Sequence, residues 1–76
     1  MTTATARVYE YQGHSIEVSA FNTGKWNAEI VICGPLTASK PQRDIIGSHV
    51  SRELAERAAR EWARRWIDSA RITRTA

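Results

Sequence analysis

The sequence predicts a small α+β domain, an antiparallel meander of three to four strands packed on one face by a single C-terminal helix. Residues 7–33 alternate polar and apolar side chains with a period of two and are rich in β-branched and aromatic types, which is typical of half-buried strands. Turn-forming residues interrupt this alternation twice. From Ser51 onward the apolar residues recur with the period of an amphipathic helix, which supplies the second layer.

The length of 76 residues fits one domain with a small core, because so short a chain hides only about 60% of the surface that it exposes when unfolded. Hydrophobic residues make up 42% of the chain and charged residues 25%, a balance typical of folded domains. We expect residues 1–6 to be a disordered N-terminus, residues 7–70 to form the domain, and residues 71–76 to be a frayed C-terminus.

Three strands are predicted, at residues 7–11, 15–21 and 26–33. A two-residue turn after Tyr11 pairs that residue with His14, and a three-residue loop at residues 22–24 pairs Ala20 with Trp26. Both hairpins place the same residues on one inner face. This agreement is informative, because a register shift of one residue would move every side chain of a strand to the opposite face. The predicted inner face consists of Tyr9, Tyr11, Ile16, Val18, Ala20, Trp26, Ala28, Ile30 and Ile32, with His14 at its edge.

After the third strand, the sequence predicts a polar loop from Leu36 to Asp44. A short fourth strand is then predicted from Asp44 to Val50, which Gly47 weakens. Ser51 is expected to cap the helix, with Glu53 in its electropositive first turn. The centre of the predicted apolar arc is formed by Ala55, Ala59, Trp62 and Trp66. We expect the alanines to let the helix approach the sheet and the tryptophans to fill the remaining space.

Few side chains are suited to catalysis. A Cys33 nucleophile with His49 as its base is conceivable, but nothing in the spacing brings the two together. A cysteine on an apolar strand usually behaves as a small hydrophobe. One cysteine and two histidines, His14 and His49, cannot supply the four ligands of a structural zinc site. We therefore predict that the protein is not an enzyme and has no catalytic residue, no cofactor and no metal site.

The net charge of +3 resides in the helix and the tail, because the charges up to residue 51 cancel. Four arginines fall within about 60° of one another on the predicted solvent side of the helix. We call Arg57, Arg60, Arg64 and Arg71 the arginine ridge. One interpretation is a solvated face with i,i+4 ion pairs in the favoured order, namely Glu53 with Arg57, Glu56 with Arg60 and Glu61 with Arg65. The other is a surface that binds phosphates or an acidic partner.

The outward face of the sheet is predicted to combine glutamates with a few apolar side chains. Glu10, Glu17 and Glu29 would repel a phosphate backbone, which disfavours DNA binding through the sheet. A modest apolar patch and two unpaired strand edges favour self-association instead. The candidate self-association face consists of Val8, Phe21, Val31 and Cys33.

Two motifs carry a family resemblance. The hairpin motif Tyr-x-Tyr-x-Gly-x-x-Ile-x-Val is formed by Tyr9, Tyr11, Gly13, Ile16 and Val18. The alanine-rich helix that ends in Trp-Ile-Asp contributes Ala55, Ala59, Ala63, Trp66, Ile67 and Asp68. On these residues the chain resembles a group of small, uncharacterised proteobacterial proteins, and this resemblance implies the strand-strand-strand-helix fold and no activity. Residues 25–30, Gly47 and the helix from Ser51 are similar in order to the antitoxin half of HicB-type toxin–antitoxin pairs, which implies a binding module.

A cytoplasmic protein is expected, because the N-terminus lacks the basic and apolar regions of a signal peptide. No apolar run approaches the roughly 20 residues that span a bilayer, so no membrane association is predicted. The leading functional hypothesis is a non-enzymatic protein-interaction module that binds a protein partner or a second copy of itself. The alternative is nucleic-acid binding through the arginine ridge.

Overall fold

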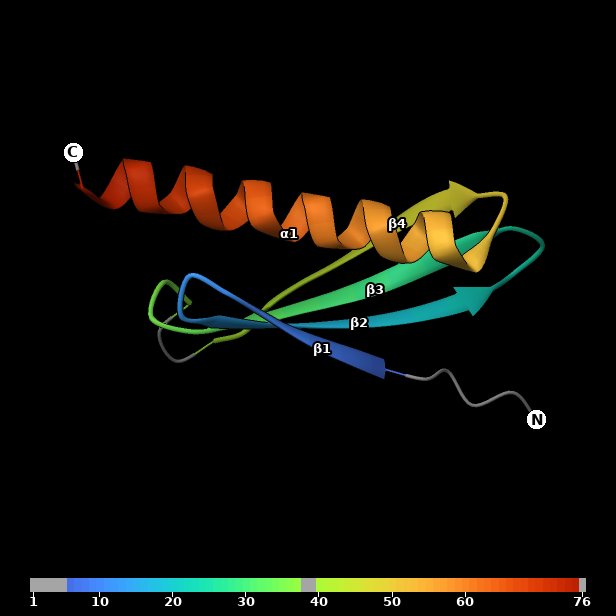
Figure 1. The fold of residues 1–76 in the computed structure, drawn as a ribbon, viewed down its shortest axis with the longest axis horizontal. Helices are drawn as coiled ribbons and strands as arrows, with labels where there is room; N and C mark the ends of the chain where they lie inside the picture. The colour runs from blue at the N-terminus through green and yellow to red at the C-terminus, as the bar shows by residue number, and fades with distance from the viewer. Residues whose placement is uncertain (1–5, 38–39, 76) are drawn as a thin grey trace.

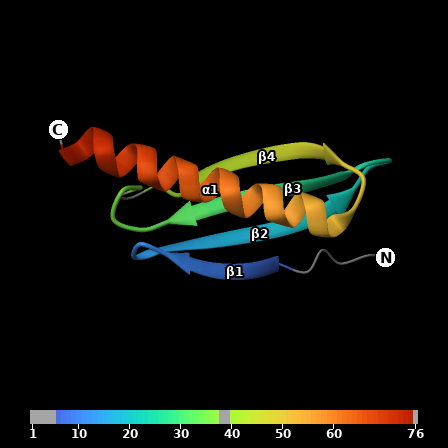
Figure 2. The ribbon, with the colours of Figure 1, turned by 45° about the horizontal axis from the view of Figure 1, so that its top comes forward.

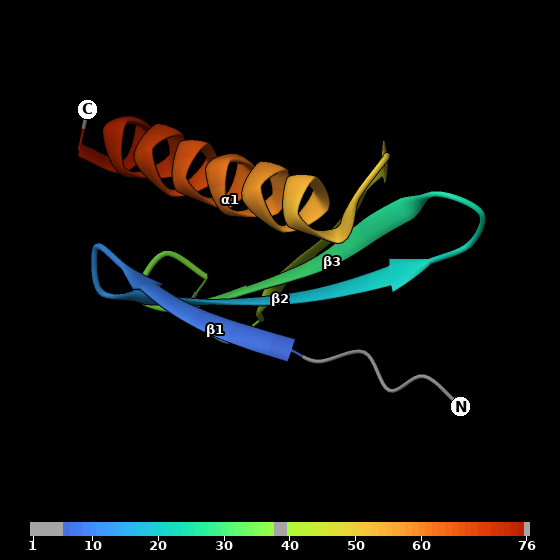
Figure 3. The ribbon, with the colours of Figure 1, turned by 45° about the vertical axis from the view of Figure 1, so that its right-hand side comes forward.

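The computed structural model describes residues 6–37 and 40–75. Its elements are β1 (Ala6–Tyr11), β2 (His14–Asn22), β3 (Trp26–Cys33), β4 (Gln42–His49) and α1 (Arg52–Thr75). The strands form one antiparallel sheet in the order β1-β2-β3-β4, and α1 lies over one of its faces (Figures 1 and 2). Figure 3 shows the helix and the sheet as two separate layers. The predicted α+β meander with one covering helix is confirmed.

Both ends of the domain differ from the predicted boundaries. The segment predicted as disordered, residues 1–6, lies outside the described residues except for Ala6, which begins β1. At the other end α1 continues beyond residue 70 to Thr75, and its last turns extend past the end of the sheet (Figure 1). No proline or glycine follows Asp68 to stop the helix.

The first hairpin has the predicted register. Tyr11 pairs with His14 and Tyr9 with Ile16. Gln12 and Gly13 both have positive φ, at 51° and 77°, as a type I′ turn requires. The handedness of such a turn matches the twist of the two strands, so two residues suffice to connect them.

The second hairpin is shifted by two residues from the predicted register. Ala20 pairs with Ala28 and Asn22 with Trp26, so the connecting loop is residues 23–25. The predicted pairing of Ala20 with Trp26 is therefore wrong. Because side chains repeat every second residue along a strand, a shift of two leaves the same residues on the inner face.

Two asparagine side chains explain the shifted loop. The Asn22 carboxamide oxygen accepts the N–H of Gly24 at 2.8 Å, which closes an Asx turn at a residue with a φ of +101°. The Asn27 side-chain amide donates to Thr23 Oγ1 and to the Lys25 carbonyl, each at 3.0 Å. These bonds stabilise a loop centred on Gly24 rather than on Thr23.

The fourth strand exists and begins two residues before Asp44. β3 runs on to Cys33, so Ile32 and Val31 offer backbone partners to Gln42 and Arg43, which were predicted as loop. The strand is therefore two residue pairs longer than its own sequence predicts. It ends at His49, one residue before the predicted end.

Gly47 permits a bulge in β4 and does not end the strand. The register with β3 shifts between Trp26 and Ala28, and Gly47 lies in the extra stretch of β4 at this point. A Cβ on Gly47 would collide with the Asn27 side chain, which the loop described above holds in place. Only glycine fits this close approach.

His14 ties the segment after β3 to the sheet. The side chain is buried, and its Nε2 accepts the N–H of Leu36 at 3.2 Å. Nδ1 therefore carries the proton and donates to the Gln12 carbonyl at 2.9 Å. A Cβ on Gly34 would collide with the imidazole ring, so the backbone leaving β3 packs directly on it. The predicted edge residue is thus a buried bridge between two loops.

The helix begins as predicted. Ser51 Oγ accepts the N–H of Leu54 at 3.2 Å and the Ser51 carbonyl accepts that of Ala55 at 3.1 Å, which is N-cap geometry. The fully buried stripe of α1 is formed by Ala55, Ala59, Ala63 and Ile67. Trp62 and Trp66 are half-buried and pack against the border of the core, so their predicted place at the centre of the arc is wrong. Ala63 and Ile67 occupy it, because a close helix leaves no room for an indole beneath its axis.

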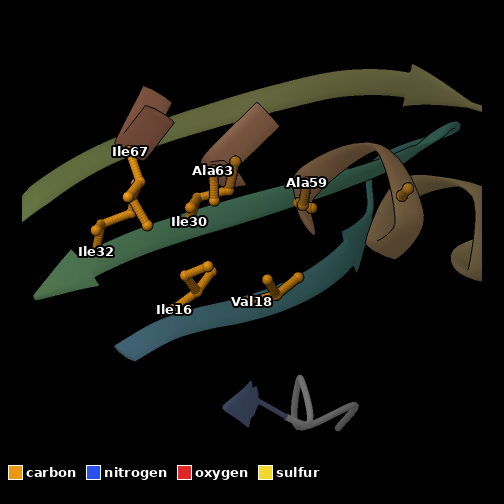
Figure 4. Close-up of a cluster of buried hydrophobic side chains, with 9 residues drawn as sticks. Ile16, Val18, Ile30, Ile32, Ala59, Ala63 and Ile67 are labelled. Carbon is orange, nitrogen blue, oxygen red and sulfur yellow. The ribbon is translucent and has the colours of Figure 1, made fainter. Parts of the chain in front are cut away.

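The core lies between this stripe and the two middle strands. Its sheet side consists of Ile16, Val18, Ala28, Ile30 and Ile32, all of them buried. In Figure 4 the side chains of the helix and of β2 and β3 point into the same space between the layers. The predicted inner face is confirmed, with Tyr9, Tyr11 and Trp26 packed around its border.

Replacing Ala59 by leucine tests how closely the helix lies on the sheet. Ala59 is completely buried, so three added carbons have no space and should lower the free energy of unfolding by about 1–3 kcal/mol in urea titrations. Ala58→Leu is the matched control, because Ala58 is the half-buried neighbour on the same helix and should change stability by about 0.5 kcal/mol or less. Equal losses in the two variants would contradict this placement of the helix.

Candidate functional site

A row of side-chain contacts joins the edge strand β1 to α1, and we call it the β1–α1 seam. Arg7 forms an ion pair with Glu56, with Nε and Oε2 3.7 Å apart. The guanidinium of Arg60 lies over the Tyr9 ring, 5.0 Å from its centroid. The seam is completed by Arg64 over the Tyr11 ring at 5.7 Å and by the Tyr11 hydroxyl, which donates to the Asp68 carboxylate oxygens at 2.8 and 2.9 Å.

The seam is regular because two periods nearly match. Residues 7, 9 and 11 face the helix at every second position of β1, a spacing of about 6.6–6.8 Å. Their partners 56, 60 and 64 recur at every fourth position of α1, a spacing of about 6.0 Å. The strand and the helix therefore stay in step over three contacts. The sequence pattern assigned the two tyrosines to packing alone. The signal for their contacts with the arginines was the match between every second residue of β1 and every fourth residue of α1.

Glu56 is the buried anion of the seam. Its side chain is 8% exposed and lies 3.3 Å from the Nε of Arg52 as well as near Arg7. The predicted pair of Glu56 with Arg60 is therefore replaced by two other arginines. Within residues 6–37 and 40–75, the predicted pairs at positions 53 and 57 and at positions 61 and 65 are also not formed.

Tyr11 and Asp68 form the polar end of the seam. The hydrogen bond that the hydroxyl donates to Asp68 raises the pKa of Tyr11 above its usual value, and burial together with the negative charge of Asp68 acts in the same direction. The neighbouring Arg64 opposes this rise in the pKa because its positive charge favours the tyrosinate. The contact therefore depends on a protonated tyrosine.

The arginine ridge runs along the solvent side of the seam. Arg60 is half-buried against Tyr9, whereas Arg57, Arg64 and Arg71 are exposed. The Nε of Arg60 is buried and has no hydrogen-bond partner in the described part of the chain. Two of the four ridge arginines are thus held by aromatic rings, an arrangement that neither predicted interpretation of the ridge included.

The candidate self-association face is divided by a charge. Val8, Glu17 and Val31 are register partners in one row across the outer face, so Glu17 stands between the two valines. Phe21 pairs with Asn27 near one end of the sheet and Cys33 with Ser15 near the other. The four predicted residues share a face but do not form a continuous apolar patch.

The free edge of β4 is bordered by apolar side chains on both faces of the sheet, with Ile45 on the outward face and Leu54 on the helix side, and we call these residues the β4 border. Ile45 is 59% exposed on the strand, Val50 is 87% exposed after it, and Leu54 is 42% exposed on α1. At 100° per residue, Trp62 lies across the buried stripe from Arg60. Since Arg60 lies over β1 at one edge of the sheet, Trp62 and Leu54 belong to the flank of α1 nearer β4 at the other edge.

The catalytic pair considered from the sequence is not assembled. Cys33 is exposed at the end of β3, whereas His49 pairs with Trp26 at its start, about 23 Å away along the strand. Among the described residues, no three His, Cys, Asp or Glu side chains lie close enough to hold a metal ion. In the same residues no helix has the length and apolar character needed to cross a membrane.

No family model, curated protein or solved structure matches this chain. The resemblance to small proteobacterial proteins and to HicB-type antitoxins therefore stays a prediction.

The variant Tyr11→Phe tests the polar end of the seam through its pH dependence. It keeps the ring under Arg64 and removes the hydroxyl that donates to Asp68. Because the pKa of Tyr11 is raised in the folded state, the stability gained from the hydroxyl is complete below the unfolded pKa of about 10 and is lost as the pH rises through the folded pKa. Urea unfolding between about pH 8 and about pH 11 should show the advantage of wild type shrinking at the alkaline end. An advantage that stays constant over this range would contradict the assignment.

Proposed function

We propose that the protein is a non-enzymatic protein-interaction module that forms a homodimer through the free edge of β4. The observation that carries this proposal is the difference between the two edge strands. Both β1 and β4 end the sheet and expose unpaired backbone groups. The side chains beside each edge strand determine whether a second copy of the chain can pair with that strand.

The β1 edge disfavours a second copy. Arg7 is 58% exposed there, and Arg60 and Arg64 lie directly above the strand. A two-fold axis at this edge would bring two rows of arginines together. Like charges that meet across an interface cost several kcal/mol, so this contact is unfavourable.

The β4 border favours a second copy. Ile45, Val50 and Leu54 expose apolar surface beside the strand, and Trp62 adds a half-buried indole. Aromatic and aliphatic side chains around an unpaired strand edge combine backbone hydrogen bonding with apolar burial, as in other interfaces built by strand addition.

The sequence of β4 also suits antiparallel pairing with itself. A two-fold axis perpendicular to the sheet keeps both helices on one face and pairs residues of the same face. An axis through Ile45 or Ile46 places these isoleucines at the centre and keeps Asp44 and Arg43 away from their own copies. Asp44 Oδ1 accepts the N–H of Ile45 at 2.8 Å in the single chain, and a strand carbonyl of the second copy would replace it.

Two further features support the rest of the proposal. The two acids of the seam, Glu56 and Asp68, are engaged in structural contacts, which supports binding rather than catalysis. Cys33 is an exposed free thiol, which supports a reducing compartment such as the cytoplasm.

Light scattering during size-exclusion chromatography tests the proposal. Wild type loaded at concentrations from about 1 μM to about 1 mM should move from the mass of one chain towards that of two. Ile45→Lys should weaken the dimer by roughly tenfold or more, because a lysine on an edge strand would face its own copy near the axis.

Val8→Lys is the matched control. Val8 lies on the same outward face, is 63% exposed and belongs to the other edge strand, so its substitution should leave the dimer intact. A chain that remains monomeric throughout would refute the proposal. Loss of the dimer in Val8→Lys alone would place the interface on the outer sheet face instead.

A further inference from the structure

We propose that the arginine ridge, as the seam presents it, binds the phosphates of a nucleic-acid strand. This site goes beyond the protein-interaction function and lies on the other side of the domain from the β4 border, so pairing through β4 leaves it open. Four features carry the proposal: fixed guanidinium groups, their free donors, the linear arrangement of the ridge, and the distribution of charge over the two faces.

The tyrosines fix two of the guanidinium groups. Arg60 lies over the Tyr9 ring at 5.0 Å and Arg64 over the Tyr11 ring at 5.7 Å, both within cation–π range. A ring occupies one face of a guanidinium and leaves the N–H groups in its plane available for oxygen. A side chain that is already ordered loses little entropy when it binds a ligand.

The donors of these two arginines are not used by carboxylates. Glu56 is held by Arg7 and Arg52, and Asp68 accepts the Tyr11 hydroxyl. In the described residues neither Arg60 nor Arg64 belongs to an ion pair. The Nε of Arg60 is buried without a hydrogen-bond partner there, so no carboxylate of the described residues uses that donor either.

The arrangement of the ridge is linear. Arg60 and Arg64 are one helical step of about 6 Å apart, and Arg57 to Arg71 covers about 21 Å along α1. A nucleic-acid strand presents anionic phosphates at regular intervals, so a row of arginines along one face of a helix can contact several of them in succession. Contacts between arginines and phosphates position a protein on a nucleic acid and carry no sequence information. Binding should therefore tolerate any base sequence.

The charges of the two faces orient the ligand. The outer sheet face carries Glu10, Glu17 and Glu29, which repel phosphates, whereas the ridge lies with the helical arginines that hold the net charge of +3. A nucleic acid is thus steered to the helical face and away from the sheet.

Fluorescence anisotropy with labelled oligonucleotides of about 20 nucleotides tests the proposal. The key variant is Arg60→Gln/Arg64→Gln. The matched control is Arg43→Gln/Arg65→Gln, which lowers the net charge equally, from +3 to +1. It removes Arg43, which lies on β4 and pairs with Glu29 of β3, and Arg65, an exposed arginine outside the ridge. Single strands of two unrelated sequences and a duplex form the ligand arms, and polyglutamate is the competitor.

Wild type should bind both single-stranded sequences alike, with an affinity that falls as salt rises. The key variant should bind roughly tenfold or more weakly for each arginine removed, and the slope of log affinity against log salt should flatten by about 1.4, which corresponds to two lost phosphate contacts. The control variant should resemble wild type. If Arg60→Gln lowers the thermal midpoint, the exposed pair Arg57→Gln/Arg64→Gln should give the same loss of binding.

Three results would overturn the proposal. Equal losses in the key and control variants would mean attraction by net charge alone. Absence of binding at low salt would remove the site. Polyglutamate that displaces the oligonucleotide at equal charge concentration would assign the ridge to an acidic protein partner. If the duplex binds more tightly than the single strands, with the same dependence on Arg60 and Arg64, the phosphate site is supported and its ligand is a double-stranded nucleic acid.

Discussion

The close approach of α1 to β2 and β3 is the contact on which the rest of the molecule depends. Alanines at positions 55, 59 and 63 are fully buried, so the helix backbone itself lies on the isoleucines of the sheet. Small residues at such a contact shorten the distance between the layers. Only at this short distance can side chains from β1, at the edge of the sheet, reach the helix. The seam is therefore a consequence of the alanine stripe, and a larger residue at Ala59 would loosen both.

The two flanks of the helix have opposite chemistry. Towards β1, Arg60 and Arg64 lie over tyrosine rings, and the acids Glu56 and Asp68 contact Arg7 and Tyr11. Towards β4, Leu54 and Trp62 stay partly exposed beside an unpaired strand edge. One flank thus concentrates positive charge and the other concentrates apolar surface. In a dimer paired through β4 the two arginine ridges would lie at the outer edges of a continuous sheet, where neither hinders the other.

Single polar side chains set the geometry of the connections. Asn22 and Asn27 fix the second hairpin, and the held Asn27 in turn leaves space only for glycine at position 47. His14 fixes the segment after β3 through the amide of Leu36. The asparagine bonds join residues two to four positions apart, whereas the His14 bond joins residues 22 positions apart. In so small a domain a few such bonds decide the register of half the sheet, because the core packs equally well on the same inner face after a shift of two residues.

The sequence by itself determined the fold class, the inner face, the first hairpin and the N-cap, because periodicity, a two-residue turn and a capping serine are local signals. The start of β4 and the register of the second hairpin needed the neighbouring strand and the asparagine contacts. For the candidate site, the sequence identified the ridge arginines but not their partners. One interpretation of the sequence paired Arg60 with Glu56, four residues away, whereas Arg60 contacts Tyr9 on a distant strand. The neighbours of a helical side chain depend on how the helix is rotated about its axis and how closely it lies on the sheet. Both are determined by the packing of the whole core, which the local sequence does not contain.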